Sequence, residues 1–354
     1  MLPVRSAICL LMLLTSFSHC KSRKQEAKLT DAGIQGEEAC LFGDQTQPSY
    51  GSSGASSIDL LSWKIISSLA AASDAAYLEP DGVRQQANAW GYPTIEHFGY
   101  GSMYAYLMTN DHCAVLAFRG TDMKSLSDWL VNLDAPRKGV EGGKVHEGFY
   151  DAETGLHRQI LRALNRGSVS RKTFWVTGHS LGGALAGIFA LKSKFERWIG
   201  DGPEMHRIVT FGQPLFADGA LAKKLRNTFV NKYYRVVNET DLVARVPFWM
   251  THFGSLVWLR KGQVDFRPDR FLAGGSNGSS NPDVMGASIP SELTADEAAY
   301  RDFLEQTKNL PKGAIMPGRM KVTGGYGAQW PKFIDDHMMA NYMRRIRNEI
   351  DDYK

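Results

Sequence analysis

The strongest sign of chemistry in this sequence is a serine placed between two glycines. Gly178, Ser180 and Gly182 follow an apolar stretch, Phe174–Thr177, that predicts a β-strand, and a small-residue stretch after them predicts a helix. A hydroxyl that attacks a carbonyl has to stand on a sharp strand-to-helix turn, which leaves room only for small residues two positions away. The pattern therefore predicts Ser180 as the nucleophile of an acyl transfer, next to a helix N-terminus that favours negative charge.

A serine nucleophile needs a histidine base and an acid that orients the base. After this type of turn the three residues follow one another in the order serine, acid, histidine, and the acid lies in a loop just after a strand. The predicted strand Tyr233–Val237 leads directly to Asp241, which is the best candidate, with Glu239 as a weaker one. Asp218 follows the preceding strand too soon.

The same chain order removes most of the nine histidines as candidates for the base. His252 and His337 remain. His252 follows Asp241 closely and leads into another predicted strand, so its ring is expected to pack or cap locally. His337 comes late in the chain, at the start of the last expected helix, and a base there can reach both Ser180 and Asp241. We favour His337 and keep His252 as the alternative.

Strands that alternate with helices are needed to position these residues. The apolar pattern predicts an α/β fold, with a parallel or mixed sheet covered by helices on both faces. The first two strands are expected to form a hairpin around Asn110-Asp111. The expected strands are Met103–Met108, Cys113–Phe118, Phe174–Thr177, Ile208–Phe211, Tyr233–Val237, Phe253–Leu259 and Val264–Phe266. The expected helices are Ile58–Tyr77, Glu153–Asn165, Gly183–Phe195, Ala220–Phe229, Thr294–Gln306 and Phe333–Ile350.

Composition narrows the class of protein. The chain has 354 residues, of which 43% are hydrophobic and 22% charged, as is usual for a globular protein. The net charge of +4 is modest, and no block of lysine and arginine alternates with aromatic residues. The sequence therefore predicts no nucleic-acid partner. It carries no signal for an oligomeric state.

The N-terminal residues predict export. Arg5 precedes an apolar run, residues 7–14, that has the length of a secretory signal and is too short to span a bilayer. We expect a signal peptide at 1–19, followed by a flexible polar tether at 20–56. Cys20 resembles the lipid-acceptor cysteine of bacterial lipoproteins, although His19 stands where a small residue is usual. The sequence thus predicts a secreted or cell-envelope protein, with a lipid anchor at Cys20 as one of two alternatives.

Two further cysteines leave a choice. In an oxidising compartment Cys40 and Cys113 can form a disulfide. A buried free thiol at Cys113 is an equal alternative, because this residue begins an apolar strand.

A series of short motifs between about residues 100 and 340 occurs in an order that is specific to one family. The motifs are Phe118-Arg-Gly-Thr121 with Asp128-Trp129, Val145-His-Glu-Gly-Phe149, Gly178-His-Ser-Leu-Gly-Gly-Ala184, Thr210-Phe-Gly-Gln-Pro214, Asp241-Leu-Val-Ala-Arg-Val-Pro247, His252 with Gly254 and Val257-Trp258, and Asp336-His337. In these motifs the sequence resembles the class 3 lipase family, the fungal-lipase-like branch of the α/β-hydrolases.

This resemblance implies the α/β-hydrolase fold, a central and mostly parallel sheet with helices on both faces. It implies triad roles for Ser180, Asp241 and His337 and a structural role for His252. Residues 57–354 would form one such domain, with an insertion at about 260–335 that is longer than the family core needs. Leu215-Phe-Ala217 also departs from the family, which usually has Arg-Val-Gly there.

The resemblance extends to the groups around the nucleophile. It assigns one oxyanion donor to Thr121, and the backbone N–H of Leu181, directly after the nucleophile, would be the second. Beyond Thr121, four large apolar residues recur at helical spacing and form one stripe. The stripe is either a fixed wall of the cleft or, as the resemblance implies, a lid that opens at a lipid surface. Its residues are Leu126, Trp129, Leu130 and Leu133.

The resemblance implies a serine hydrolase of lipid esters that works through an acyl-enzyme and requires no cofactor and no metal. A triacylglycerol is the leading substrate, with a phospholipase A1-type or short-chain carboxylesterase activity as alternatives. The expected partners are a lipid ester and a lipid interface or membrane. A hypothesis of another class is a catalytically silent, surface-anchored binding protein on the same scaffold.

Overall fold

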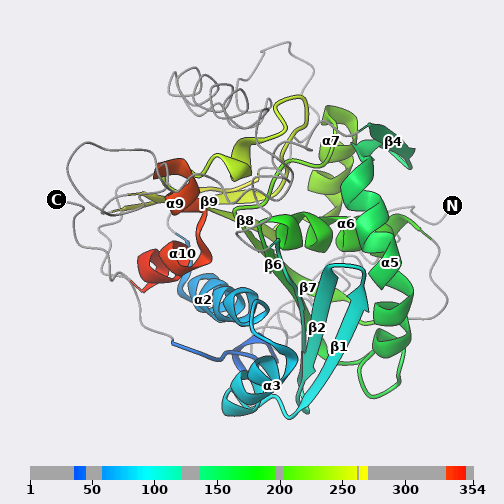
Figure 1. Cartoon of the computed structure of the whole chain (residues 1–354), viewed down its shortest axis with the longest axis vertical. Helices are drawn as coiled ribbons and strands as arrows, with labels where there is room; N and C mark the ends of the chain where they lie inside the picture. The colour runs from blue at the N-terminus through cyan, green and yellow to red at the C-terminus, as the bar shows by residue number, and fades with distance from the viewer. Residues whose placement is uncertain are drawn as a thin grey trace, which may run out of the picture. The chain divides into compact units, whose positions relative to one another are not determined.

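The computed structural model describes residues 36–44, 58–121, 136–196, 202–260, 263–269 and 332–347. They belong to two units, Met1–Leu41 and Phe42–Lys354, and the sheet and the helices named below lie in the second (Figure 1). The expected signal peptide, Cys20, the apolar stripe at 126–133 and the expected helix Thr294–Gln306 lie outside the described residues.

Cys40 and Cys113 are both fully buried, and each is disulfide-bonded. Of the two states that the sequence allows for Cys113, the free thiol is therefore wrong. Phe42, in the stretch expected as a flexible tether, is buried as well. Its ring centroid lies 4.8 Å from that of Trp90 and 5.2 Å from that of Tyr92. This part of the expected tether is packed, because an aromatic side chain gains by leaving water.

The described strands form an eight-stranded sheet in the order β1-β2-β3-β6-β7-β8-β9-β10. Neighbours from β3 to β9 pair in parallel, and the pairs β1–β2, β2–β3 and β9–β10 are antiparallel. The expected mostly parallel sheet is thus confirmed. The strands are β1 (Thr94–Tyr100), β2 (Met103–Thr109), β3 (Cys113–Phe118), β6 (Thr173–His179), β7 (Met205–Phe211), β8 (Tyr233–Asn238), β9 (Ser255–Arg260) and β10 (Gln263–Arg267). Two shorter strands, β4 (Arg137–Val140) and β5 (Gly143–His146), form a separate hairpin.

Continuous apolar runs predicted the central strands correctly, because both faces of these strands are covered. Every residue of β3 and β8 is buried. The hairpin between β2 and β3 is also confirmed, and the side-chain oxygen of Asn110 in its turn accepts a hydrogen bond from the backbone N–H of Cys113 (2.8 Å). Strand β1 was not expected. Only Phe98 of its seven residues is buried, so its apolar signal is weak.

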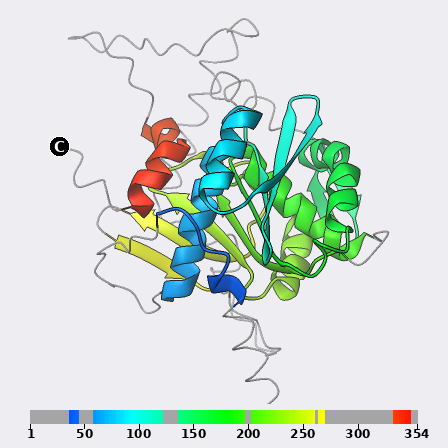
Figure 2. The same cartoon turned by 90° about the horizontal axis from the view of Figure 1, so that it is seen from below.

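Helices cover both faces of the sheet (Figures 1 and 2). Helix α6 (Leu181–Phe195) packs against β3, β6 and β7 and against α5 (Glu147–Leu164). On the opposite face α2 (Leu60–Ala75) packs against β6 and β7, and α10 (Met339–Ile346) packs against α2 and β8. Helices α3 (Pro80–Ala89) and α7 (Gly219–Thr228) complete the longer described helices. Within the described ranges, no helix is long and apolar enough to cross a membrane.

The last expected helix, Phe333–Ile350, is wrong as one continuous element. The structure has α9 (Lys332–His337) and then α10, with Met338 between them in an extended conformation (φ −62°, ψ 131°). The Asn341 side chain donates a hydrogen bond to the Asp335 carbonyl (2.7 Å) across this break. A polar side chain thereby satisfies a carbonyl at the end of α9, which helical periodicity does not reveal.

Candidate active site

Ser180 stands on the turn between β6 and α6 in a conformation that is unusual for a residue with a side chain (φ 57°, ψ −129°). The two glycines beside it are needed because the backbone passes very close. A Cβ on Gly178 would lie 2.3 Å from the Gly182 carbonyl oxygen, and a Cβ on Gly182 would lie 2.2 Å from the Phe118 carbonyl oxygen. The turn therefore has the crowded geometry that the sequence pattern predicts for a nucleophile between a strand and a helix.

Ser180, His337 and Asp241 form one hydrogen-bonded chain. The His337 Nε2 lies 2.9 Å from the Ser180 Oγ. The opposite ring nitrogen, Nδ1, lies 3.0 Å from Oδ1 and 2.9 Å from Oδ2 of Asp241. All three side chains are almost completely buried. The serine comes from the carboxyl end of β6, the acid follows β8, and the histidine ends α9, so three distant segments meet at one edge of the sheet.

The Asp241 carboxylate is held in its charged form. The Tyr342 hydroxyl donates a hydrogen bond to Oδ2 (2.5 Å), and the backbone N–H of Val243 donates one to Oδ1 (2.9 Å). Burial alone would raise the pKa of Asp241, but the His337 ring, the Tyr342 hydroxyl and His179 together hold this pKa below its usual value. A buried carboxylate that stays ionised can orient the His337 ring and stabilise its protonated form.

His179 packs against His337 and contacts its backbone. Its ring stacks on the His337 ring with centroids 4.7 Å apart, and its Nε2 lies 2.7 Å from the His337 carbonyl oxygen. The Tyr77 hydroxyl lies 2.7 Å from its Nδ1. Burial and the neighbouring His337 lower the pKa of His179 to about 3, so the ring is neutral. A neutral ring fits there, because a second charge would oppose protonation of His337.

The loop that carries the acid is fastened to the helix that carries the base. The carboxylate Oδ2 of Asp336 accepts hydrogen bonds from the Thr240 hydroxyl (2.6 Å) and the Thr240 backbone N–H (3.1 Å). The Asn238 side chain donates one to the Asp336 carbonyl (2.9 Å). These contacts fix Asp241 and His337 relative to each other through their neighbours in the chain.

Glu239, the weaker candidate for the acid, and His252, the alternative base, form other interactions. Glu239 forms an ion pair with Arg345 (3.0 Å). His252 is half-buried, and its Nε2 donates a hydrogen bond to the Ala244 carbonyl (2.6 Å). Burial and the positive charge of Arg235 lower the pKa of His252 well below its usual value. Neither residue is part of the chain of hydrogen bonds at Ser180.

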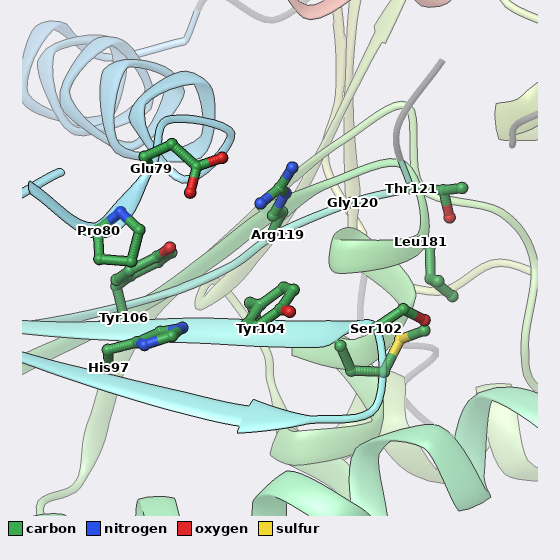
Figure 3. A pocket seen from close by; sticks show the side chains of 11 residues that line it. Glu79, Pro80, His97, Ser102, Tyr104, Tyr106, Arg119, Gly120, Thr121 and Leu181 are labelled. Atoms are coloured by element: carbon green, nitrogen blue, oxygen red, sulfur yellow. The ribbon is translucent and has the colours of Figure 1, made fainter. Parts of the chain in front are cut away.

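The predicted oxyanion residues line a cavity of about 550 Å³ next to the nucleophile (Figure 3). Thr121 follows β3, and Leu181 is the first residue of α6. Of the residues that the structure describes, eleven line the cavity: Glu79, Pro80, His97, Ser102, Met103, Tyr104, Tyr106, Arg119, Gly120, Thr121 and Leu181. The stripe Leu126, Trp129, Leu130 and Leu133, predicted as a lid or cleft wall, lies outside the described residues.

Residues 115–251 match the model of a known protein family, "Lipase (class 3)". The predicted resemblance to this family is confirmed. The chain is 32% identical to a lipase of Rhizomucor miehei over 152 residues, which cover 41% of this chain and 41% of that protein. It is 28% identical to the triacylglycerol lipase OBL1 of Ricinus communis over 242 residues, 54% of this chain and 45% of that protein. The matched part therefore spans less than half the length of these curated relatives.

A solved structure of the Rhizomucor miehei triacylglyceride lipase is similar with a TM-score of 0.46 and 23% identity, over 58% of this chain and 82% of that one.

Sequence reasoning missed Tyr342, His179 and Tyr77 as parts of the site. A signal was present for His179, which lies inside the motif around Ser180, but chain order excludes it only as a base and says nothing about a supporting role. Tyr342 reaches Asp241 across 101 positions of the chain, and no local pattern marks such a contact.

Proposed function

We propose that this protein hydrolyses lipid esters, with Ser180 as nucleophile, His337 as base and Asp241 as the acid that orients the base. The observation that carries the proposal is the chain of hydrogen bonds from the Ser180 Oγ through the His337 ring to the Asp241 carboxylate. The strained conformation of Ser180 and the ionised state of the buried Asp241 support it further.

In the proposed reaction the Ser180 Oγ attacks the ester carbonyl carbon while His337 Nε2 takes the hydroxyl proton. The tetrahedral intermediate collapses, the C–O bond to the alcohol breaks, and His337 returns the proton to the leaving oxygen. Water then attacks the acyl-enzyme in the same way and releases the fatty acid. Asp241 holds Nδ1 of the ring in its protonated tautomer and stabilises the imidazolium at each step.

The oxyanion of the intermediate would be stabilised by Thr121 and by the backbone N–H of Leu181 at the first turn of α6. Loss of one such donor costs about 2.7–4 kcal/mol of transition-state stabilisation. The proposed chemistry uses only these side chains and backbone groups, and it requires no metal or organic cofactor.

A triacylglycerol is the leading substrate, because a relative that is 28% identical to this chain is named a triacylglycerol lipase. The charged groups in the cavity beside Thr121 favour a second candidate, a phospholipase A1-type activity. We further propose that the protein is secreted or held at the cell envelope.

One experiment separates this proposal from a silent binding protein. A fluorophosphonate probe should label the wild-type protein covalently at Ser180, and Ser180→Ala should remove both labelling and hydrolysis of p-nitrophenyl butyrate. The matched control is Ser193→Ala, because this serine also lies on α6 but near the end of the helix opposite to Ser180. Labelling that persists in Ser180→Ala, or activity within about tenfold of wild type, would refute the assignment of the nucleophile.

A further inference from the structure

The cavity beside the proposed oxyanion residues carries charges that the ester chemistry does not use. Arg119 lies directly before Gly120 and Thr121 and lines the cavity. Its guanidinium lies over the ring of Tyr104, 5.6 Å from the centroid. Glu79, an exposed carboxylate at the N-terminus of α3, lines the same cavity. A cleft built only for a triacylglycerol needs neither charge, because that lipid has no ionised group.

One wall of the cavity is aromatic. His97 lies on β1 opposite Tyr106 on β2, and Tyr104 lies two residues before Tyr106 on the same face of the hairpin. The His97 ring stacks on the Tyr104 ring (5.3 Å between centroids) and on the Tyr106 ring (4.9 Å). We call these three residues the aromatic wall. Tyr106 is buried beneath the His97 ring, so His97 and Tyr104 form the accessible part of the wall. Faces of aromatic rings attract cations, quaternary ammonium groups included.

The charges of Arg119 and Glu79 affect the pKa of Tyr106 in the aromatic wall. Burial raises the pKa of Tyr106, the positive charge of Arg119 opposes the rise and the negative charge of Glu79 adds to it. Both charged side chains therefore lie within electrostatic reach of the same ring. Burial lowers the pKa of His97, so its ring is uncharged at neutral pH and does not repel a cation.

The order of these groups is informative (Figure 3). Thr121 and Leu181 lie at one end of the view, Arg119 lies in the middle, and Glu79 lies at the other end with Tyr106 and His97. The cavity thus presents oxyanion donors, then a cation, then a carboxylate beside the aromatic wall. A zwitterionic glycerophospholipid has complementary groups in the same order: an acyl ester, a phosphate and an ammonium group.

Arg119 and Thr121 also lie close together along the chain. They are two residues apart, so their Cα atoms are separated by at most about 7 Å. Only the glycerol carbons and ester oxygens separate the phosphate of such a lipid from its acyl carbonyl. An arginine is well suited to a phosphate, because its planar donors can bind two of the oxygens.

We propose that this cavity, which we call the head-group pocket, binds the head group of a zwitterionic glycerophospholipid and that the protein hydrolyses an acyl ester of this lipid. Arg119 binds the phosphate, and Glu79 binds the ammonium group together with the accessible part of the aromatic wall, His97 and Tyr104. This inference rests on the proposed function, since the ester is cleaved at Ser180. The acyl C–O bond breaks, and water supplies the hydroxyl of the fatty acid and the proton of the lysophospholipid hydroxyl.

The test compares dioleoylphosphatidylcholine with dioleoylglycerol in the same neutral detergent micelles. The wild-type protein should hydrolyse both. Arg119→Gln should lower the ratio of the two kcat/KM values at least about tenfold, which corresponds to about 1.4 kcal/mol. The matched control is Arg260→Gln, because Arg260 also lies over an aromatic ring, that of Trp258 (4.5 Å), on another strand. The control should keep the wild-type ratio.

Glu79 is tested with lipids that differ only in the ammonium group. Glu79→Gln should lower the kcat/KM ratio of dioleoylphosphatidylcholine to dioleoylphosphatidylglycerol, because the second lipid offers no cation to the carboxylate. The control is Glu141→Gln, an exposed carboxylate on the separate β4–β5 hairpin (68% exposed). A change in this ratio with unchanged circular dichroism supports the assignment of Glu79.

Three results would overturn the head-group pocket. They are an equal loss on both lipids in Arg119→Gln, a wild type that hydrolyses dioleoylglycerol but not phosphatidylcholine, and a wild type that hydrolyses a galactosyl diacylglycerol in its place. In each of these cases Ser180 would still react with fluorophosphonate, so the proposed function stands. If no ester is hydrolysed and Ser180 is not labelled, the proposed function fails. Calorimetric binding of a soluble short-chain phosphatidylcholine, lost in Arg119→Gln, then decides the pocket separately.

Discussion

Tyr342→Phe tests whether the hydrogen bonds behind the acid contribute to catalysis. The tyrosine is fully buried and its hydroxyl donates to Asp241 Oδ2 (2.5 Å) while it accepts from the Asn238 backbone N–H (3.1 Å). Removal of only this oxygen leaves the ring packing in place. It takes one charge-assisted donor from the carboxylate, a contact worth about 1.5–3 kcal/mol.

The free energy of the lost hydrogen bond should appear partly as lower stability and partly as a lower reaction rate. If about 1–2 kcal/mol of it is expressed in the transition state, where Asp241 stabilises the protonated His337, kcat/KM for p-nitrophenyl butyrate falls about 5–30-fold. The Tyr342 hydrogen bond lowers the pKa of Asp241, so the variant should have a higher pKa at this carboxyl. The acidic limb of its pH–rate profile should therefore move to higher pH.

The effect on stability has a definite sign. The folded-state pKa of Asp241 lies below its usual value of 3.8, so the carboxylate stabilises the fold above that pH and the contribution is lost as the pH falls through the folded-state pKa. The difference in free energy of unfolding between wild type and Tyr342→Phe should shrink in the same range. Urea titrations at several pH values measure it.

Tyr92→Phe is the matched control, because Tyr92 is equally buried but packs on Phe42 and not on the triad. It should lower stability without a change in the pH–rate profile. If Tyr342→Phe keeps kcat/KM within twofold of wild type and its acidic limb does not move, Asp241 does not depend on the hydroxyl. The reasoning from the short contact would then be refuted.

The remaining predictions separate roles that the sequence left open. His337→Ala should lower ester hydrolysis at least about 10⁴-fold, to near the level of Ser180→Ala, because triad members act as a unit. His252→Ala should instead lower the melting temperature, since it breaks the partly buried hydrogen bond to Ala244; the reverse pattern would show that the wrong histidine was chosen. Trp129→Asp should depress hydrolysis of emulsified long-chain esters far more than that of a soluble butyrate ester, and equal losses would favour a fixed wall over a lid. Cys20→Ser should turn a membrane-bound protein into a soluble one in bacterial fractions, and a soluble wild type beginning at His19 would eliminate the lipid anchor.

Local patterns were enough to predict the turn at Ser180. Its geometry depends on residues within a few positions, Gly178 and Gly182, whose size is dictated by the backbone around them. The central strands were predictable for a similar reason, since strands covered on both faces are apolar throughout. Chain order then selected Asp241 and His337 without any knowledge of the distance between them.

Contacts between distant segments were not predictable from such patterns. The break at Met338 interrupts a sequence whose apolar periodicity continues, and only the structure shows that it lets His337 end α9 beside Asp241. Strand β1 has one buried residue, so its role as the partner of β2 leaves little trace in the apolar pattern. The aromatic wall was missed for this reason, because one of its three rings lies on that strand.

The proposed chemistry and the proposed selectivity lie on separate parts of the fold. Asp241 and His337 are joined through Thr240 and Asp336, on segments 96 positions apart, so a change in this clamp should alter the rate for every ester. The head-group pocket is instead built from the β1–β2 hairpin, the N-terminus of α3 and Arg119 at the end of β3. Within the described residues, the pocket lining comes next to the proposed chemistry at Gly120, Thr121 and Leu181. A substitution in the pocket that spares these three residues can therefore change which lipid is cleaved while the hydrogen bonds at Ser180 stay intact. Because of this separation, the ratio of the kcat/KM values for two lipids tests the pocket more sharply than the rate with either lipid alone.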